Sequence, residues 1–159
     1  MKRILFGTIA LLSSTTTALA VDISVIDYMK VLPKKGGIMC PPAKLVVIYG
    51  SDDLKFCIEP ASFIKTAYGG RARLIMALSS NGKNLYTATF QETNCLAMEE
   101  RESMLWSISN YRGKNSKATL AASGWWFQGY DHKEGWTKWK PITGQTEWNE
   151  WICKRFKEA

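Results

Sequence analysis

Four cysteines constrain this chain more than any other feature of its sequence: Cys40, Cys57, Cys95 and Cys153. They follow an amino-terminal leader, and an even number of cysteines in an exported chain is typical of a fold held by disulfides. Gaps of 16, 37 and 57 residues separate them, which excludes a CxxC redox pair or a close-spaced zinc knuckle. We favour the pairs Cys40–Cys57 and Cys95–Cys153 among the three arrangements that spacing leaves open.

The first 20 residues have the three parts of a secretory signal peptide. Two basic residues precede an apolar run from Ile4 to Leu12, and a small-residue cleavage site ends at Ala20. The run is shorter than the roughly 20 apolar residues that a membrane-spanning helix needs, and no later run reaches that length. We therefore expect a bacterial-type leader and a mature protein, beginning at Val21, that is periplasmic or secreted.

The mature chain, residues 21–159, is long enough for one globular domain with a single core. The leader carries two of the 21 basic residues and none of the 14 acidic ones, so its removal lowers the formal net charge from +7 to +5. The excess positive charge is spread along the chain. It favours anionic partners in general, such as lipid headgroups, acidic glycans or acidic proteins, without selecting one of them.

The pattern of the mature chain predicts an α+β domain, mainly antiparallel sheet with short helices. The clearest local signal is Asn81-Gly82 between two β-rich runs, because both central residues of a type I′ hairpin turn take positive φ. Residues 21–32 fit either a short helix or a strand. The expected strand pairs cover 44–59, 72–92, 105–123 and 125–142.

Three segments predict short helices. Residues 61–68 follow Pro60 and precede two glycines, and residues 95–104 follow Asn94, a good helix cap. The terminal segment 146–159 has apolar residues at helical spacing and basic residues in its last turn. Its apolar residues are Trp148, Trp151, Ile152 and Phe156.

Catalytic motifs are scarce in this sequence. His132 is the one histidine of the chain, and Asp131, the adjacent carboxylate, would diverge from it in a strand or turn. There is no GxSxG elbow and no GxxxxGK phosphate loop. The chain has one histidine, and its four cysteines are expected to form disulfides, so too few ligands remain for a metal site. We therefore expect neither a metal nor another cofactor.

A small secreted hydrolase, for example a nuclease, is the alternative function. His132 and a carboxylate such as Glu134 or Glu147 would act as general acid and base. Cations would hold the phosphate of the substrate. We favour the simpler interpretation that residues 130–135 form a solvated polar turn. The candidate cations are Arg112, Lys133 and Lys138.

Tryptophans are concentrated near the carboxyl terminus, where six of the seven fall between Trp125 and Trp151. Trp125 and Trp126 are consecutive, so in a strand they point to opposite faces. The same holds for Trp136 and Trp139 if their segment is a strand. At least one indole is therefore expected outside the main core, although the cluster, including Trp151, would also suit a core.

Exposed indoles beside cations suit three uses: stacking on sugar rings, settling at an anionic membrane surface, and anchoring a protein partner. Nucleic acid is a poor candidate for an exported chain. We predict a non-enzymatic binding protein of the inhibitor, immunity, toxin-subunit or secretion-accessory type, docking on a protein or glycan at the cell envelope or outside the cell. The predicted binding residues are Trp126, Trp136, Lys138, Trp139, Lys140 and Arg155, with Trp126 and Trp139 as the first choices for surface anchors.

Overall fold

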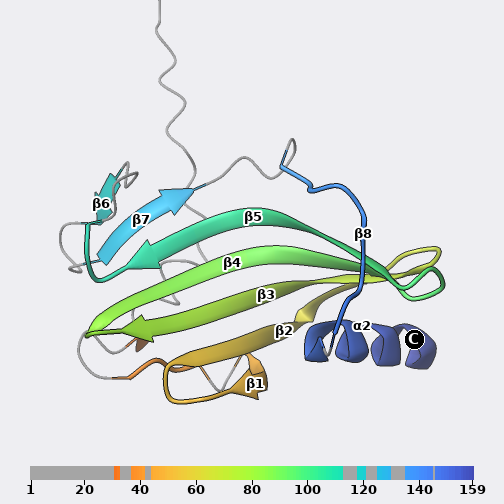
Figure 1. Ribbon diagram of the computed structural model, residues 1–159, viewed down its shortest axis with the longest axis horizontal. Coiled ribbons are helices and arrows are strands. Elements are labelled where there is room, and N and C mark those ends of the chain that lie inside the picture. The colour runs from red at the N-terminus through yellow and green to blue at the C-terminus, as the bar shows by residue number, and fades with distance from the viewer. Residues whose placement is uncertain are drawn as a thin grey trace, which may run out of the picture.

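An antiparallel sheet dominates the computed structural model of the chain, and the helix α2 lies against one end of it (Figure 1). The strands are hydrogen-bonded in the order β1-β2-β3-β4-β5-β7-β6, and β8 pairs with β5 beyond this path. The prediction of a mainly antiparallel sheet with a carboxyl-terminal helix is confirmed. The structure describes residues 31–32, 37–41, 44–112, 118–120, 125–129, 135–144 and 146–159.

The elements differ widely in length. Four strands, β2 to β5, run for 11 or 12 residues each and form most of the sheet in Figure 1, whereas β6 and β8 are short. The elements are β1 (Val46–Gly50), β2 (Leu54–Lys65), β3 (Gly69–Ser80), β4 (Lys83–Asn94), β5 (Glu99–Ser109), β6 (Ala118–Leu120), β7 (Trp125–Gly129), β8 (Lys140–Pro141) and α2 (Glu147–Glu158).

The turn between β3 and β4 forms as predicted. Asn81 has φ 50° and Gly82 has φ 71°, the left-handed conformations that a two-residue hairpin turn needs. The turn places Ser80 opposite Lys83, and the pairing then continues without interruption to Gly69 opposite Asn94. The hairpin of β1 and β2 is confirmed as well.

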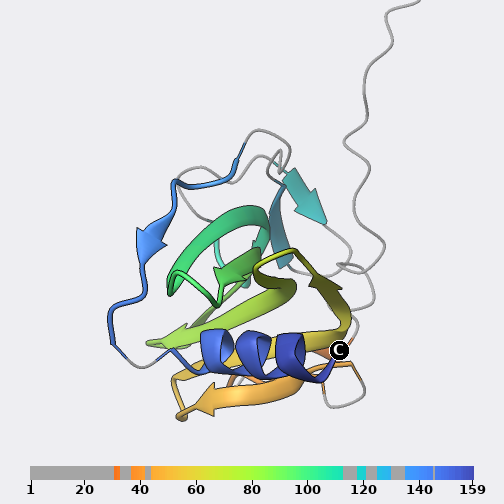
Figure 2. The same ribbon diagram turned by 90° about the vertical axis from the view of Figure 1, so that its right-hand side faces the viewer.

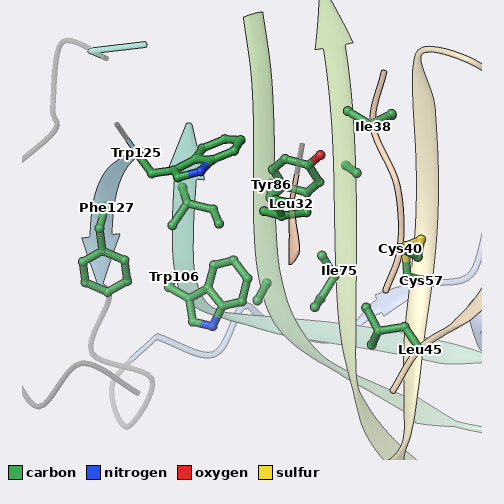
Figure 3. Packing of buried hydrophobic residues seen from close by; sticks show 13 residues of the cluster. Leu32, Ile38, Cys40, Leu45, Cys57, Ile75, Tyr86, Trp106, Trp125 and Phe127 are labelled. Atoms are coloured by element: carbon green, nitrogen blue, oxygen red, sulfur yellow. A yellow bond between two sulfur atoms is a disulfide. The ribbon is translucent and has the colours of Figure 1, made fainter. Parts of the chain in front are cut away.

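Each face of the sheet has its own core. On one face, called the back face, Tyr86 and Trp106 pack with Trp125 and with residues of the segment before β1 (Figure 3). On the other face, called the helix face, Ile152 of α2 packs on Ile58 and Leu74. Figure 2 shows α2 lying across the strands. The two cores occupy opposite faces because side chains alternate along each strand.

Both predicted disulfides are present. Cys40–Cys57 ties the segment before β1 to β2, and Cys95–Cys153 ties the turn between β4 and β5 to α2. Their Cα atoms are 6.1 Å and 5.5 Å apart, within the usual range for a disulfide. Each bridge therefore joins a peripheral element to the sheet or to its turns.

A buried polar network also holds α2 to the helix face. One carboxylate oxygen of Glu100, Oε2, accepts hydrogen bonds from Gln91 Nε2 at 2.9 Å, Asn149 Nδ2 at 2.6 Å and Trp148 Nε1 at 3.2 Å. Asn149 also accepts a hydrogen bond from the hydroxyl of Thr93. The network satisfies buried polar groups of two strands and of the helix, so it orients α2 as well as attaching it.

The helix predicted at 61–68 is instead the end of β2. The register of β2 against β3 shifts between Glu59 and Ile64, which makes room for the extra residues around Pro60. The Ser62 hydroxyl donates to the Glu59 carbonyl and accepts from the Arg73 backbone N–H, both at 2.7 Å. This side chain supplies hydrogen bonds that the interrupted ladder lacks, and the strand continues beyond it.

The helix predicted at 95–104 is also wrong, although its cap forms. Asn94 Oδ1 accepts hydrogen bonds from the backbone N–H groups of Leu96 and Ala97. The turn then ends at Met98, whose φ of 56° is left-handed, and the chain reverses into β5. A tight turn between two long strands has replaced the helix.

The pairings predicted for the carboxyl-terminal strands are wrong. β7 was expected to pair with the segment after residue 134, but it lies between β5 and β6 and pairs with both. β7 pairs with the end of β5, around Ile108, whereas Trp136 and β8 pair with its beginning, from Ser103 to Glu99. The two segments follow one another along the same edge of β5 because that edge is long enough to take both.

Some predictions concern residues outside the described ones: the signal peptide, nearly all of the segment 21–32, and the turn with His132 and Glu134. Among the described residues, no helix combines the length and the apolar character needed to cross a bilayer.

Candidate functional site

The predicted binding residues do not form one surface. Trp136 and Trp139 come together at the beginning of β5, whereas Trp126 lies opposite Ser109 at the other end of that strand. Ser103, the partner of Trp136, is six residues from Ser109, which corresponds to roughly 20 Å along a strand. Trp126 also points to the helix face, because its neighbour Phe127 belongs to the back-face core.

The expected divergence of the adjacent tryptophans is observed. Trp125 is buried in the back-face core, where it packs edge-on against Tyr86 at 5.8 Å. Trp126 is half-buried, and the guanidinium of Arg112 lies 5.3 Å from its ring centroid.

The three predicted cations are dispersed. Lys138, which lies between Trp136 and Trp139 in the chain, is exposed, and Lys140 Nζ lies 3.4 Å from Glu100 Oε1 in an ion pair. Arg155 is exposed in the last turn of α2, the helix that packs on the opposite face of the sheet. Lys140 therefore extends the polar network around Glu100. Arg155 lies on a different surface.

Two rows of side chains cross the back face beside Trp136. In the first row Arg73 lies opposite Phe90, which lies opposite Ser103. In the second row Arg71 lies opposite Glu92, which lies opposite Arg101. Directly opposite residues of an antiparallel sheet point to the same side, so both rows share one surface. We call this set the arginine–aromatic surface: Arg71, Arg73, Phe90, Glu92, Arg101, Trp136 and Trp139.

Arg101 forms the centre of the surface. Its Nη2 and Nε atoms lie 2.7 Å and 2.8 Å from Glu92 Oε2. Its guanidinium carbon lies 4.8 Å from the ring centroid of Trp136 and 4.5 Å from that of Trp139, at cation–π distance. Tyr68 packs edge-on against Trp139 at 5.8 Å. The arginine is thus held by a buried carboxylate and by two aromatic rings.

The segment that carries the two tryptophans is anchored by backbone contacts. The Thr137 N–H donates to the Glu102 carbonyl at 2.9 Å, and the Glu102 N–H donates to the Thr137 hydroxyl at 3.0 Å. These contacts flank Trp136 and fix its indole over the beginning of β5.

Arg71 and Arg73 differ in how their charges are balanced. Arg73 Nη1 lies 3.2 Å from Glu59 Oε2, and both guanidinium groups approach the ring of Phe90, at 6.0 Å for Arg71 and 5.9 Å for Arg73. Arg71 forms no ion pair with a described carboxylate, and its buried Nε atom has no hydrogen-bond partner among the described residues. The Arg71 guanidinium carries further N–H donors besides the buried Nε, so Arg71 is the candidate position for an acceptor from a ligand.

Among the described residues, the charges of the surface sum to an excess of one positive charge when the adjacent Glu59 is included. Glu59 pairs with Arg73 and Glu92 pairs with Arg101, which leaves the excess at Arg71. The chemistry available here is recognition of an anion by a guanidinium group, with rigid aromatic rings beside it.

The arginines of this surface were not among the predicted binding residues, although the position of two of them follows from the sequence. Once Asn81-Gly82 is the turn, the hairpin register alone places Arg73 opposite Phe90 and Arg71 opposite Glu92. The position of Arg101 could not be predicted from the turn, because the register of β4 against β5 shifts at the bulge after Ala88.

The alternative catalytic site and the comparisons with known proteins give no further information on the function. His132 and Glu134 lie outside the described residues, and the described part of the chain contains no group of three metal-ligating side chains. The chain matches no family model, no curated protein and no solved structure.

Proposed function

We propose that this protein is an exported, non-enzymatic binding protein that docks on acidic side chains of a partner protein through its arginine–aromatic surface. One observation carries the proposal: the half-buried Arg71 forms no ion pair with any carboxylate of the described residues, in a surface whose other described charges are paired. The two disulfides agree with an oxidising compartment.

A carboxylate is the group that this position suits. A guanidinium presents several N–H donors in a plane, and a carboxylate accepts two of them side by side. Arg71 lies beside Phe90, and the aromatic ring limits the access of water on one side. The nearby carboxylates do not compete strongly for Arg71, because Glu92 is bonded to Arg101 and Glu59 to Arg73.

The surroundings of Arg71 favour a protein over a glycan. Stacking on a sugar ring needs an open indole face, and Arg101 leaves at most one face of Trp136 and one of Trp139 for it. Ile64, opposite Arg71 on β2, is exposed and offers apolar contact. Arginines and aromatic residues with apolar neighbours are the composition of protein-interface anchors.

Binding to immobilised poly-L-glutamate, compared with heparin as an acidic glycan, tests the proposal. We expect salt-sensitive binding to poly-L-glutamate that Arg71→Met weakens by about tenfold or more, since it removes a charge-assisted hydrogen bond. Arg155→Met is the matched control because it makes the same charge change on α2.

Two outcomes would overturn the proposal. Equal losses in Arg71→Met and Arg155→Met would indicate attraction by net charge without a specific surface. Binding to heparin but not to poly-L-glutamate would assign the surface to acidic glycans. Circular dichroism of both variants checks that the fold is retained.

A further inference from the structure

We propose that a pocket beside the Cys95–Cys153 disulfide binds a single-chain amphiphile with an anionic head, such as a fatty acid. The pocket has a volume of about 430 Å³, within the range of small-molecule sites. It lies between α2, the turn that precedes β5 and the segment that follows β8. The residues used in the argument are Cys95, Met98, Ile142, Cys153, Lys154 and Lys157.

The walls of the pocket are connected to one another. The disulfide joins the turn to α2, and the Ile142 N–H donates to the Met98 carbonyl at 2.9 Å. At the start of the helix, Asn149 Nδ2 donates to the Thr146 hydroxyl at 2.7 Å. A pocket whose walls are already fixed requires little ordering when a ligand binds, which favours affinity.

The lining combines an apolar part with two cations. Met98, Ile142 and the disulfide are apolar, and Lys154 and Lys157 are three residues apart, on the same side of α2. Glu150 also lines the pocket, so the lining keeps an excess of one positive charge. An acyl chain would lie on the apolar part, and its head group would lie within reach of the flexible lysines.

An exposed apolar side chain in the wall of the pocket supports an apolar ligand. Met98 lines the pocket and is 57% exposed. A peptide in the pocket would bring backbone N–H and C=O groups against an apolar lining, where their desolvation is costly. An acyl chain has no such groups, and we therefore choose it over a peptide.

Isothermal titration of the mature protein with sodium dodecanoate tests the pocket. Hexanoate and the dodecyltrimethylammonium cation serve as short-chain and opposite-charge controls. We expect dodecanoate to bind at least about tenfold more tightly than hexanoate, because each buried methylene adds affinity. We expect the cation to bind more weakly than dodecanoate because the lysines repel it.

Met98→Asn separates binding from folding. Asparagine tolerates the left-handed φ of this position, so the fold is retained while the apolar wall is lost. We expect this variant to weaken dodecanoate binding about tenfold. Leu96→Asn is the matched control on the same turn, because Leu96 does not line the pocket, and it should bind as the unmodified protein does.

Three results would overturn the inference. Equal weakening by Met98→Asn and Leu96→Asn would indicate surface adsorption, and no preference for dodecanoate over hexanoate would exclude an acyl-chain site. Binding to phosphatidylglycerol vesicles without binding of monomeric dodecanoate would assign the turn to a membrane surface. Arg71→Met should leave dodecanoate binding unchanged, so this test is independent of the proposed docking surface.

Discussion

Arg71 lies directly opposite Glu92 on neighbouring strands, yet the carboxylate of Glu92 is bonded to Arg101 on the other side. Glu92 thus fixes Arg101, and no other carboxylate in the described part of the chain forms an ion pair with Arg71. The two arginines are chemically identical, and their different partners give them different roles. Arg101 stabilises the surface, whereas Arg71 is the arginine that we propose for binding a partner.

Glu92→Gln should destabilise the protein by about 1–3 kcal/mol, because it leaves Arg101 without its charged partner. The carboxylate is 5% exposed and the arginine side chain 28% exposed, so solvent only partly compensates the arginine. Urea unfolding measures the difference. Asp52→Asn, at an exposed turn, should change the free energy of unfolding by less than about 0.5 kcal/mol. Equal effects of the two substitutions would contradict the structural role of the pair.

The tryptophans should differ in reactivity towards N-bromosuccinimide. Trp125 is 1% exposed and Trp106 is 2% exposed, so both should resist oxidation until the protein unfolds. Trp126, adjacent to Trp125 in the chain, is half-buried and should be oxidised first of the two. Peptide mass spectrometry after light oxidation resolves each position. Simultaneous oxidation of Trp125 and Trp126 in the folded protein would contradict their assignment to opposite faces.

Asn149→Asp should destabilise the protein more than Asn149→Ala does at neutral pH. The alanine variant loses the donor to Glu100 and the acceptor for Thr93, which costs about 2 kcal/mol. The aspartate variant adds a second carboxylate beside Glu100, and the repulsion raises the pKa of that pair in the folded state.

The pH dependence distinguishes these two variants. A raised carboxyl pKa stabilises the fold at pH values below that of the unfolded group, near 4, and the stabilisation is lost as pH rises. The deficit of Asn149→Asp relative to Asn149→Ala should therefore shrink between pH 7 and pH 4. Unfolding by urea at several pH values measures it, and a constant deficit would contradict the proximity of the two side chains.

Tyr86→Phe should reduce the loss of stability at alkaline pH. Burial raises the pKa of the Tyr86 phenol above its ordinary value of 10.0, while a backbone hydrogen bond with Met39 acts in the opposite direction. The unfolded chain then releases this proton at a lower pH than the folded protein, so stability falls as pH rises above about 10. Thermal unfolding from pH 8 to pH 11 should show a shallower decline for the variant, and identical slopes would contradict a buried neutral phenol.

The sequence by itself determined the elements that depend on neighbouring residues. Asn81-Gly82 specifies a hairpin turn, and the turn in turn specifies which residues of β3 and β4 face one another. The terminal helix was predictable from its 3.6-residue apolar period. Both disulfides were among the pairings that the cysteine positions allowed, and the folded chain selected the favoured ones.

Only the tertiary structure decided how distant segments share β5. Local periodicity does not predict which segment pairs with the edge of a strand. β7 pairs with the end of β5, whereas Trp136 and β8 pair with its beginning. The same non-local pairing brings Trp136 and Trp139 onto Arg101 and leaves Trp126 on the opposite face. Backbone hydrogen bonding is indifferent to side-chain identity, so the arrangement follows from the packing of the whole sheet and cannot be read from any one segment.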